Sequence, residues 1–579
     1  MRLTPRNKNH SPSHPRPSLA VAALLALLFA ACSLDASQDE HAAPSPLTNE
    51  ARGADALLQL PANSPPYIAQ TWQSALTAPL PNAFTLGVFG PAVPASEQTL
   101  DLSGLLGSYQ PGGPTTVATN AFFQPLGTNG RTCATCHQPP GGMSISKLNI
   151  LTRYLLSGVE DPLFAPVDGA NCPNAVPASS TSPSHLGGLK GLGKAITQAA
   201  AHSLILDRGV MRIFLPVPAN AQFTISVVSD PNGCNTDPSY NQVTNPTTGV
   251  TTQIISVYRR PRISSNLQFV TTGIANTFPF VIPPQDPITG VPLPVNPYSG
   301  QFETGNIMWD GREPTLQSQA VDATLSHAQA LAAPSTAQIN EIVAFETGFF
   351  SAQSSDFVAG SLTAKGAVGG PVNLPAVAPG QLASLLSTIR FTDYNSWSTV
   401  TGSTPAELRQ ESIYRGQQIF NTGTFTVSNV AGLNNITAIG NNAIASCGLC
   451  HNQVEAGNDS FPNAQHNIGV AGDAPAFGGP QPATDLPIFK IVCNSGTSTV
   501  YNGTTVYTND PGLALITGQC ADVGRTSVPQ LRALAAHPPY FHDGSAQTLL
   551  DVVNFYNTRF NIGYTAQEKT DLVNFLNAL

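Results

Sequence analysis

Two short motifs carry residues that could do chemistry, at positions 133–137 (CATCH) and 447–451 (CGLCH). In each, two thiols separated by two residues are spaced to form thioethers with the two vinyl groups of one haem. The adjacent His can then serve as the iron ligand. A zinc site would need two more ligands close by, and neither motif has an obvious second pair. The sequence therefore predicts two covalently attached haem c groups, held by Cys133, Cys136, His137, Cys447, Cys450 and His451.

The start of the chain predicts export. A basic leader with Arg2, Arg6 and Lys8 precedes an apolar run over 18–31 that is too short to span a bilayer. The run ends in two Ala residues before Cys32, so we expect a lipoprotein signal over 1–32, with simple cleavage as the alternative. The expected location is the periplasm or the outer membrane, with lipid on Cys32 as the only membrane contact.

Four further cysteines follow the haem motifs in two pairs. We expect two local disulfides, Cys172–Cys234 and Cys493–Cys520, as suits an oxidising compartment.

Only 10% of the residues are charged, and the net charge of -9 comes without a basic stripe. Nucleic-acid binding is therefore not expected.

Both haem motifs need elements to position them, and the two halves of the chain repeat one plan of helix, CxxCH, loop and helix. We expect a mainly α fold with two cytochrome-c-like haem domains and long loops, because Gly and Pro number 49 and 51. A tether over 33–90 precedes a first domain over 91–391 and a second over 392–579. An insertion over about 155–260 is expected to be partly β, with strand-like segments at 211–215 and 223–228. Helices are expected at 309–332, 405–420, 547–558 and 565–579.

Beyond the haem motifs, four ordered stretches resemble a known family. They are 308–312 (MWDGR), 466–470 (HNIGV), 525–532 (RTSVPQLR) and 539–544 (PYFHDG), the last continuing to 553–556 (VNFY). Together they are similar to the dihaem bacterial cytochrome c peroxidase and MauG superfamily. The insertion is not covered by this resemblance.

The resemblance implies roles for particular residues. Trp309 matches a Trp that lies between the two haems and conducts electrons, and Gln319 matches a Gln over the peroxide-binding haem. Arg532 matches an Arg that contacts a haem propionate, and His542 matches a His near the inter-haem region. A calcium ion between the domains is a further candidate, because family members often bind one through carbonyls and waters.

The sequence limits which residues can supply the sixth ligand of the second haem iron. The four Met residues all precede the second motif, so a Met ligand from that domain is excluded. In the resemblance, the Met position aligns with Tyr556, which is the MauG-like arrangement. His466 and His537 are the rivals.

The first haem departs from the family pattern. Where typical members have a Pro and a proton-transferring Glu, this chain has Ala323 and Gln329, and Gln cannot act as a general base. Asp322 or His327 lies close enough in sequence to substitute, and His327 could instead ligate the iron. The site is then an open peroxide site, an oxygen-binding site as in the latex-cleaving dihaem oxygenases, or a closed bis-His centre.

These observations favour an exported dihaem oxidoreductase. It would reduce hydrogen peroxide, or another small oxidant, at the His137 haem, where Gln319 and His327 orient the peroxide. Electrons would be relayed from the second haem through Trp309. The donor would be a small cytochrome, a cupredoxin or an organic substrate. The alternatives are an electron-transfer cytochrome of the cell envelope and an oxygen-activating dihaem oxygenase.

Overall fold

The computed structural model describes residues 90–176, 197–273, 304–379 and 390–579. The expected signal peptide, Cys32 and all of the expected tether except Gly90 lie outside these residues. Within the described ranges, no helix has the length and apolar character needed to cross a bilayer.

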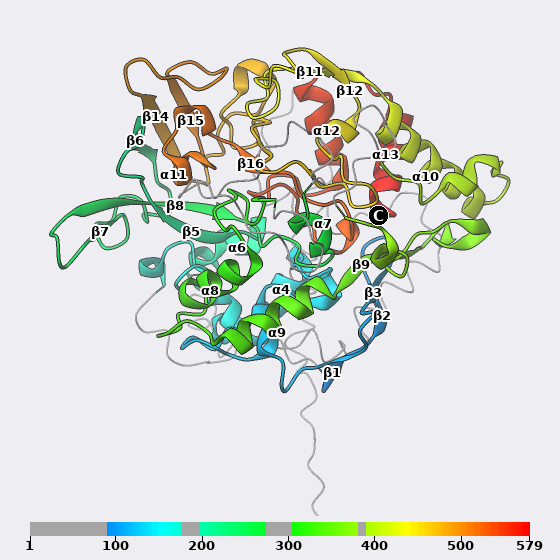
Figure 1. Cartoon of the computed structure of the whole chain (residues 1–579), viewed down its shortest axis with the longest axis horizontal. Helices are drawn as coiled ribbons and strands as arrows, with labels where there is room; N and C mark the ends of the chain where they lie inside the picture. The colour runs from blue at the N-terminus through cyan, green and yellow to red at the C-terminus, as the bar shows by residue number, and fades with distance from the viewer. Residues whose placement is uncertain (1–89, 177–196, 274–303, 380–389) are drawn as a thin grey trace, which may run out of the picture. The chain divides into compact units, whose positions relative to one another are not determined.

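The expectation of a mainly α fold is wrong. Sixteen strands in six small sheets lie between the helices of the described residues (Figure 1). Several strands are polar in sequence, such as Phe350–Asp356, and so carry little of the β-branched enrichment that identifies strands. Their pairing depends on partners far away in the chain.

The helices follow the expected order, with α8 shorter at both ends than expected and α10 two residues longer. Thr315 and Thr404 begin α8 and α10 as capping-box residues, each accepting a hydrogen bond from the N–H three residues on. The α-helices are α4 (Lys147–Ser157), α6 (Ser203–Arg208), α7 (Leu267–Thr271), α8 (Leu316–Ser326), α9 (Thr336–Thr347), α10 (Pro405–Thr422), α11 (Ala514–Thr517), α12 (Leu549–Arg559) and α13 (Ala566–Asn577).

The largest sheet has four strands in the order β10-β9-β3-β2. It pairs residues near the start of the described chain with the segment that follows α9, and all its pairings are antiparallel. Its strands are β2 (Ser96–Leu100), β3 (Gly104–Tyr109), β9 (Phe350–Asp356) and β10 (Gly360–Ser361). Three two-stranded ladders are β1 (Ala92–Val93) with β4 (Thr115–Thr116), β11 (Phe425–Val427) with β12 (Ala443–Ala445), and β13 (Gln465–His466) with β16 (Thr526–Ser527).

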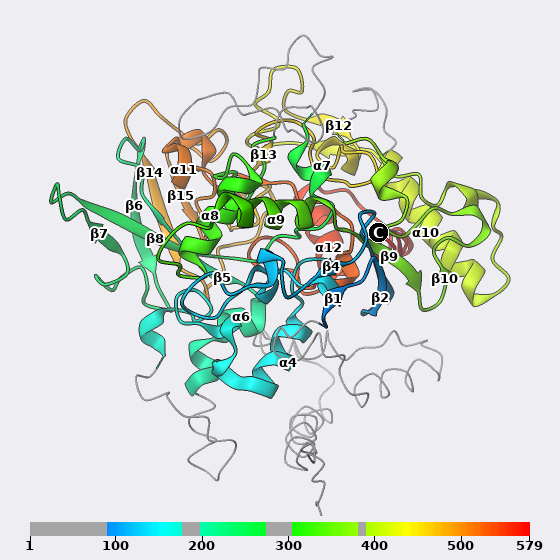
Figure 2. The same ribbon diagram turned by 60° about the horizontal axis from the view of Figure 1, so that its bottom comes forward.

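Two three-stranded sheets build on the insertion. In one, β5 (Met211–Pro216) and β7 (Gln242–Thr244) flank β8 (Thr251–Arg259). In the other, β6 (Phe223–Ser229) pairs with β14 (Ile488–Cys493), which also pairs with β15 (Thr505–Thr508). Figure 2 shows β6 beside β14 and β15. Strands therefore occur at both expected segments, but β6 reaches across the expected boundary at 391, and that boundary stays a prediction.

Both disulfide pairings expected from the sequence are confirmed. Cys172 is bonded to Cys234, with the two Cα atoms 5.4 Å apart. Cys493 is bonded to Cys520, with a Cα–Cα distance of 6.0 Å. The first disulfide joins the loop after α4 to the segment after β6, and the second joins β14 to the segment after α11.

The helical core of the second half rests on the contact between α10 and α13. Phe420 of α10 and Phe575 of α13 are buried and pack together, with ring centroids 5.7 Å apart. At their closest approach, a Cβ added to Gly416 would lie only 2.0 Å from the carbonyl oxygen of Asp571. A glycine is required there because the backbone of α13 occupies the space that any side chain would need.

We predict that Gly416→Ala lowers the free energy of unfolding by about 1–2 kcal/mol. Alanine alone would favour the helix by about 1 kcal/mol, but the overpacking against a backbone oxygen outweighs this gain. Urea unfolding of the purified protein measures the difference. Thr570→Ala, at an exposed site on α13, should change the value by less than about 0.5 kcal/mol. A more stable Gly416→Ala variant would contradict the close contact.

Candidate functional site

The two CxxCH motifs adopt the same local structure. Each begins as a short 3-10 turn, over Cys133–Thr135 and Cys447–Leu449. The backbone N–H of His137 donates to the carbonyl of Cys133 at 3.0 Å, and that of His451 donates to Cys447 at 3.2 Å. All four thiols of the motifs are free. One turn of chain thus brings two thiols and an imidazole together in each motif.

Both imidazoles are held by a backbone carbonyl six residues further along the chain. Nδ1 of His137 donates to the carbonyl of Met143 at 3.1 Å, and Nδ1 of His451 donates to Gly457 at 2.5 Å. Met143 and Gly457 both have a positive φ, 61° and 73°. Burial lowers the pKa of both imidazoles, so they are neutral near pH 7. An imidazole held at Nδ1 by a carbonyl presents Nε2 to a metal, as haem ligation requires.

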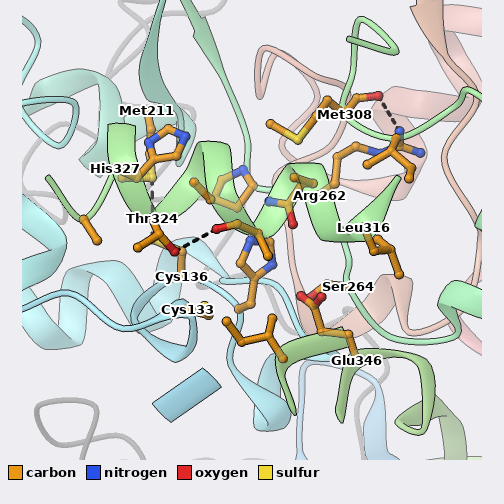
Figure 3. A pocket seen from close by; sticks show the side chains of 18 of the residues that line it. Cys133, Cys136, Met211, Arg262, Ser264, Met308, Leu316, Thr324, His327 and Glu346 are labelled. Atoms are coloured by element: carbon orange, nitrogen blue, oxygen red, sulfur yellow. Dashed lines mark hydrogen bonds between the residues drawn. The ribbon is translucent and has the colours of Figure 1, made fainter. Parts of the chain in front are cut away.

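A large cavity opens beside His137, with about 1360 Å³ of open space. Helix α8 forms part of its wall, and Figure 3 shows His327 and Thr324 at one end and Leu316 at the other. The residues of α8 and its C-cap that line the cavity recur at helical spacing, as expected for one face: Leu316, Gln319, Ala320, Ala323, Thr324 and His327. His137, Gln319 and His327, the residues expected at the first haem, thus line one cavity, and their roles there stay predictions.

The ring of His327 is anchored by a residue that the sequence did not reveal. Its Nδ1 donates to Oδ2 of Asp168, whose other oxygen pairs with Arg131. Burial alone would raise the pKa of Asp168, but Arg131 and His327 outweigh burial and hold this pKa below its usual range. Asp168 lies inside the insertion, where the resemblance offered no guide.

The other residues considered at the first haem lie elsewhere. Asp322 approaches Arg312 at 3.7 Å, and Gln329 lies beyond the end of α8 with a φ of 55° and is not part of the cavity wall. The sequence also missed Glu346 of α9, a buried carboxyl that lines the cavity. Burial raises its pKa to about 8, and among the described residues Oε2 has no hydrogen-bond partner.

A second cavity, with about 1750 Å³ of open space, surrounds His451. Tyr556 lies in its wall, and burial raises the pKa of its phenol. Both rivals line the same cavity: Nε2 of His466 is 3.0 Å from Oδ2 of Asp459, and burial lowers the pKa of His537 to about 3. All three groups proposed as sixth ligand are thus within one cavity.

The two cavities share a wall that contains Trp309. Its indole Nε1 donates to the carbonyl of Arg260 at 2.8 Å, and the guanidinium of Arg262 lies 5.2 Å from the ring. The ring of His542 lies 6.0 Å from Trp309 on the side of the second cavity. Arg260, Arg262 and Trp309 line both cavities.

Buried ion pairs support this wall. Arg259, at the end of β8, bonds to Asp310 and Asp510, and Arg312 also bonds to Asp310 at 3.0 Å. The pKa of Asp310 is held at about 2, because Arg312 and Arg259 outweigh the effect of burial. The motif around Trp309 is thereby tied to β8 and to the segment after β15.

Arg532 does not lie at either cavity. Its guanidinium is buried between Asp393 and Glu455, at 3.0 and 3.1 Å. The geometry therefore gives no support to the propionate contact expected from the resemblance. For the calcium candidate, the described residues contain no group of three or more His, Cys, Asp or Glu side chains arranged to hold a metal ion.

The fit of these cavities to haem c rests on their donor set. Each has two free thiols at the required spacing and a neutral imidazole with Nε2 available. The walls are largely apolar, and the first cavity includes Leu126, Ile263 and Leu267. A porphyrin needs such a wall with a few polar groups at defined points.

Curated relatives match only parts of the chain. A cytochrome-c peroxidase, IdrP2, of Denitromonas iodatirespirans is 32% identical over 140 residues, which is 23% of this chain and 35% of the relative. A cytochrome-c peroxidase, IdrP1, of Pseudomonas sp. (strain SCT) is 29% identical over 155 residues, 24% of this chain and 37% of the relative. The chain thus spans about a third of the length of these relatives. No family model matches it.

Among solved structures, the chain is similar to a MauG-like protein associated with microbial copper homeostasis. The match is 20% identical, covers 55% of this chain and 80% of the other, and has a TM-score of 0.24. A TM-score this low does not allow a shared fold to be inferred.

We predict that Arg259→Met lowers the free energy of unfolding by about 3–5 kcal/mol, because Asp310 loses one of its partners and Asp510 its guanidinium, both in a buried site. Chemical denaturation measures the loss. Lys365→Met, which removes the more exposed pair between Lys365 and Glu407, should cost much less. Equal effects of the two substitutions would show that burial of the Arg259 pairs is not important.

Glu346 predicts a pH dependence of stability. Its pKa in the folded protein is raised to about 8, so the folded state binds a proton that the unfolded state releases above about pH 4.3. Stability should therefore fall as the pH rises from about 5 to 8. In Glu346→Gln this contribution to the fall should disappear. Parallel curves for the two proteins, measured as free energy of unfolding against pH, would show that Glu346 ionises normally.

Proposed function

We propose that this protein is a peroxidase-type oxidoreductase that holds one haem c at each CxxCH motif and reduces hydrogen peroxide in the His137 cavity. The observation that carries the proposal is the pair of cavities joined by one wall. Each cavity has a complete set of haem donors, and Trp309 borders both. The partial similarity to cytochrome-c peroxidases supports the same reaction.

In the first cavity, a haem c on Cys133, Cys136 and His137 would supply the redox chemistry. Gln319 and His327 of the α8 segment are among the polar groups that line this cavity. The amide of Gln319 would orient the peroxide by hydrogen bonding. The imidazole of His327 would move the proton that O–O bond cleavage requires.

In the second cavity, we propose Tyr556 as the sixth ligand beside His451. Its phenol lies in the wall of the same cavity, and Tyr is an established haem ligand. This cavity would receive electrons from an external donor, which we propose to be a small cytochrome, a cupredoxin or an organic substrate. Trp309 would relay them to the first cavity.

One observation favours a second candidate function. A His that donates Nδ1–H to a carboxylate, as His327 does to Asp168, is also typical of a metal ligand. If His327 ligated the iron, both haems would be closed and the protein would be an electron-transfer cytochrome.

We propose for either function that the protein is exported and anchored at Cys32. The two disulfides agree with an oxidising compartment.

Low-temperature EPR and visible spectra of the ferric protein, before and after one equivalent of hydrogen peroxide, test the peroxidase function. We expect one high-spin haem whose signal is lost on addition of peroxide, since an open iron is needed to bind peroxide. Two low-spin haems that do not respond would overturn the peroxidase function and support the electron carrier.

Matched variants assign the signals. Cys133→Ala with Cys136→Ala should remove one covalently bound haem together with the peroxide-sensitive signal. Cys447→Ala with Cys450→Ala should remove the other haem and leave the high-spin signal in place. The reverse assignment would place peroxide reduction at His451.

A further inference from the structure

Asp168 connects three segments at the edge of the first cavity. Its side chain is fully buried, and its two oxygens take different partners, Nδ1 of His327 and a guanidinium nitrogen of Arg131. Arg131 lies just before the CxxCH motif, Asp168 lies in the insertion, and His327 caps the C-terminus of α8. The haem-attachment segment and the α8 wall are thereby held to one carboxylate.

The partners of Asp168 are themselves fixed. Arg131 donates to the carbonyls of Pro162 and Leu163 at 2.7 and 2.8 Å, so its guanidinium is held from two sides. Asn129 donates to the carbonyl of His327 at 2.8 Å, which holds the end of α8. By contrast, 26% of the His327 side chain is exposed, and it borders the cavity.

This arrangement determines which nitrogen of His327 carries the proton. An ionised carboxylate only accepts hydrogen bonds. Paired with Arg131, Asp168 remains ionised, so Nδ1 of His327 must be the protonated nitrogen. In the neutral ring, Nε2 then has a free lone pair. An imidazole in this state can take a proton from a substrate, as in catalytic triads.

We propose that Asp168 is a positioning residue that prepares His327 for proton transfer in the His137 cavity, in place of the Glu that the α8 segment lacks. This inference rests on the proposed function. Nε2 of His327 takes the proton from one oxygen of hydrogen peroxide and gives it to the other oxygen as the O–O bond breaks. Two electrons from the external donor and two protons from solvent complete the conversion of one peroxide to two waters.

The test uses two reactions of the holoprotein, followed by stopped-flow absorbance. One is the reaction with hydrogen peroxide. The other is the binding of hydrogen cyanide to the ferric protein, in which the same proton must leave the acid but no turnover is needed. Asp168→Asn and His327→Gln should each slow both reactions by about tenfold or more. Asp168→Glu keeps a charge for Arg131 and should restore part of the rate.

Two comparisons separate positioning from a structural role. Asp161→Asn, which removes the carboxylate of a neighbouring buried pair with Arg153, should leave both rates within about twofold of wild type, since this pair does not touch His327. The double variant Asp168→Asn with His327→Gln should be no slower than His327→Gln alone, because Asp168 acts only through His327. If the two substitutions slow the reactions by factors that multiply in the double variant, the proposal is overturned.

Three further outcomes of the cyanide and peroxide measurements decide whether the positioning role of Asp168 and the proposed function hold. If the wild-type protein binds cyanide rapidly and Asp168→Asn does so equally fast, the proposal fails while the proposed function stands. If cyanide binding depends on Asp168 but peroxide is not reduced, the proposed function fails while the positioning role stands. If wild type binds no cyanide and His327→Gln does, His327 is an iron ligand, and both are overturned.

Discussion

The buried contacts of Arg259 with Asp310 and Asp510 are the interaction on which the rest of the site depends. Buried charges are stable only when paired and hydrogen-bonded, so these contacts fix the end of β8 against the segment that carries Trp309. Arg260 and Arg262 follow directly, and in the described residues they are satisfied mainly by backbone carbonyls. The wall between the two cavities is therefore held by buried ion pairs and hydrogen bonds and carries positively charged side chains, as would suit the carboxylates of haem propionates.

The two CxxCH motifs adopt one local geometry in different surroundings. The His137 motif lies near α4, α8 and α9, whereas the His451 motif lies against α10 and α12. Nevertheless, both histidines use the carbonyl six residues on, and both acceptor residues have a left-handed backbone. The shared geometry follows from the need to turn the chain back under the imidazole, whatever elements lie around it.

Structural features that depend on local sequence were predictable, and features that depend on distant partners were not. The disulfide pairings and the main positions of α10, α12 and α13 were expected, because cysteine spacing and apolar periodicity are local. The polar strand β9 and the pairing of β6 with β14 were missed, since each depends on a distant partner. At the site, Gln319 and Tyr556 were expected from the resemblance, and His327 from its place in the sequence near the missing Glu. Asp168 and Glu346 were not, because only folding brings them to the cavity.

The pairing of β6 with β14 constrains the order in which the protein can be made. Strand β6 belongs to the first half of the chain, but its partner is absent until synthesis has passed Cys493. Until then, β6, which includes Val227 and Val228, lacks the strand with which it pairs in this sheet. Segments fold in order as they emerge, so Cys133 and Cys136 are present for a long interval before the first half can close. Covalent modification of these thiols therefore has a longer window during biosynthesis than that of Cys447 and Cys450, which lie shortly before β14 in the chain.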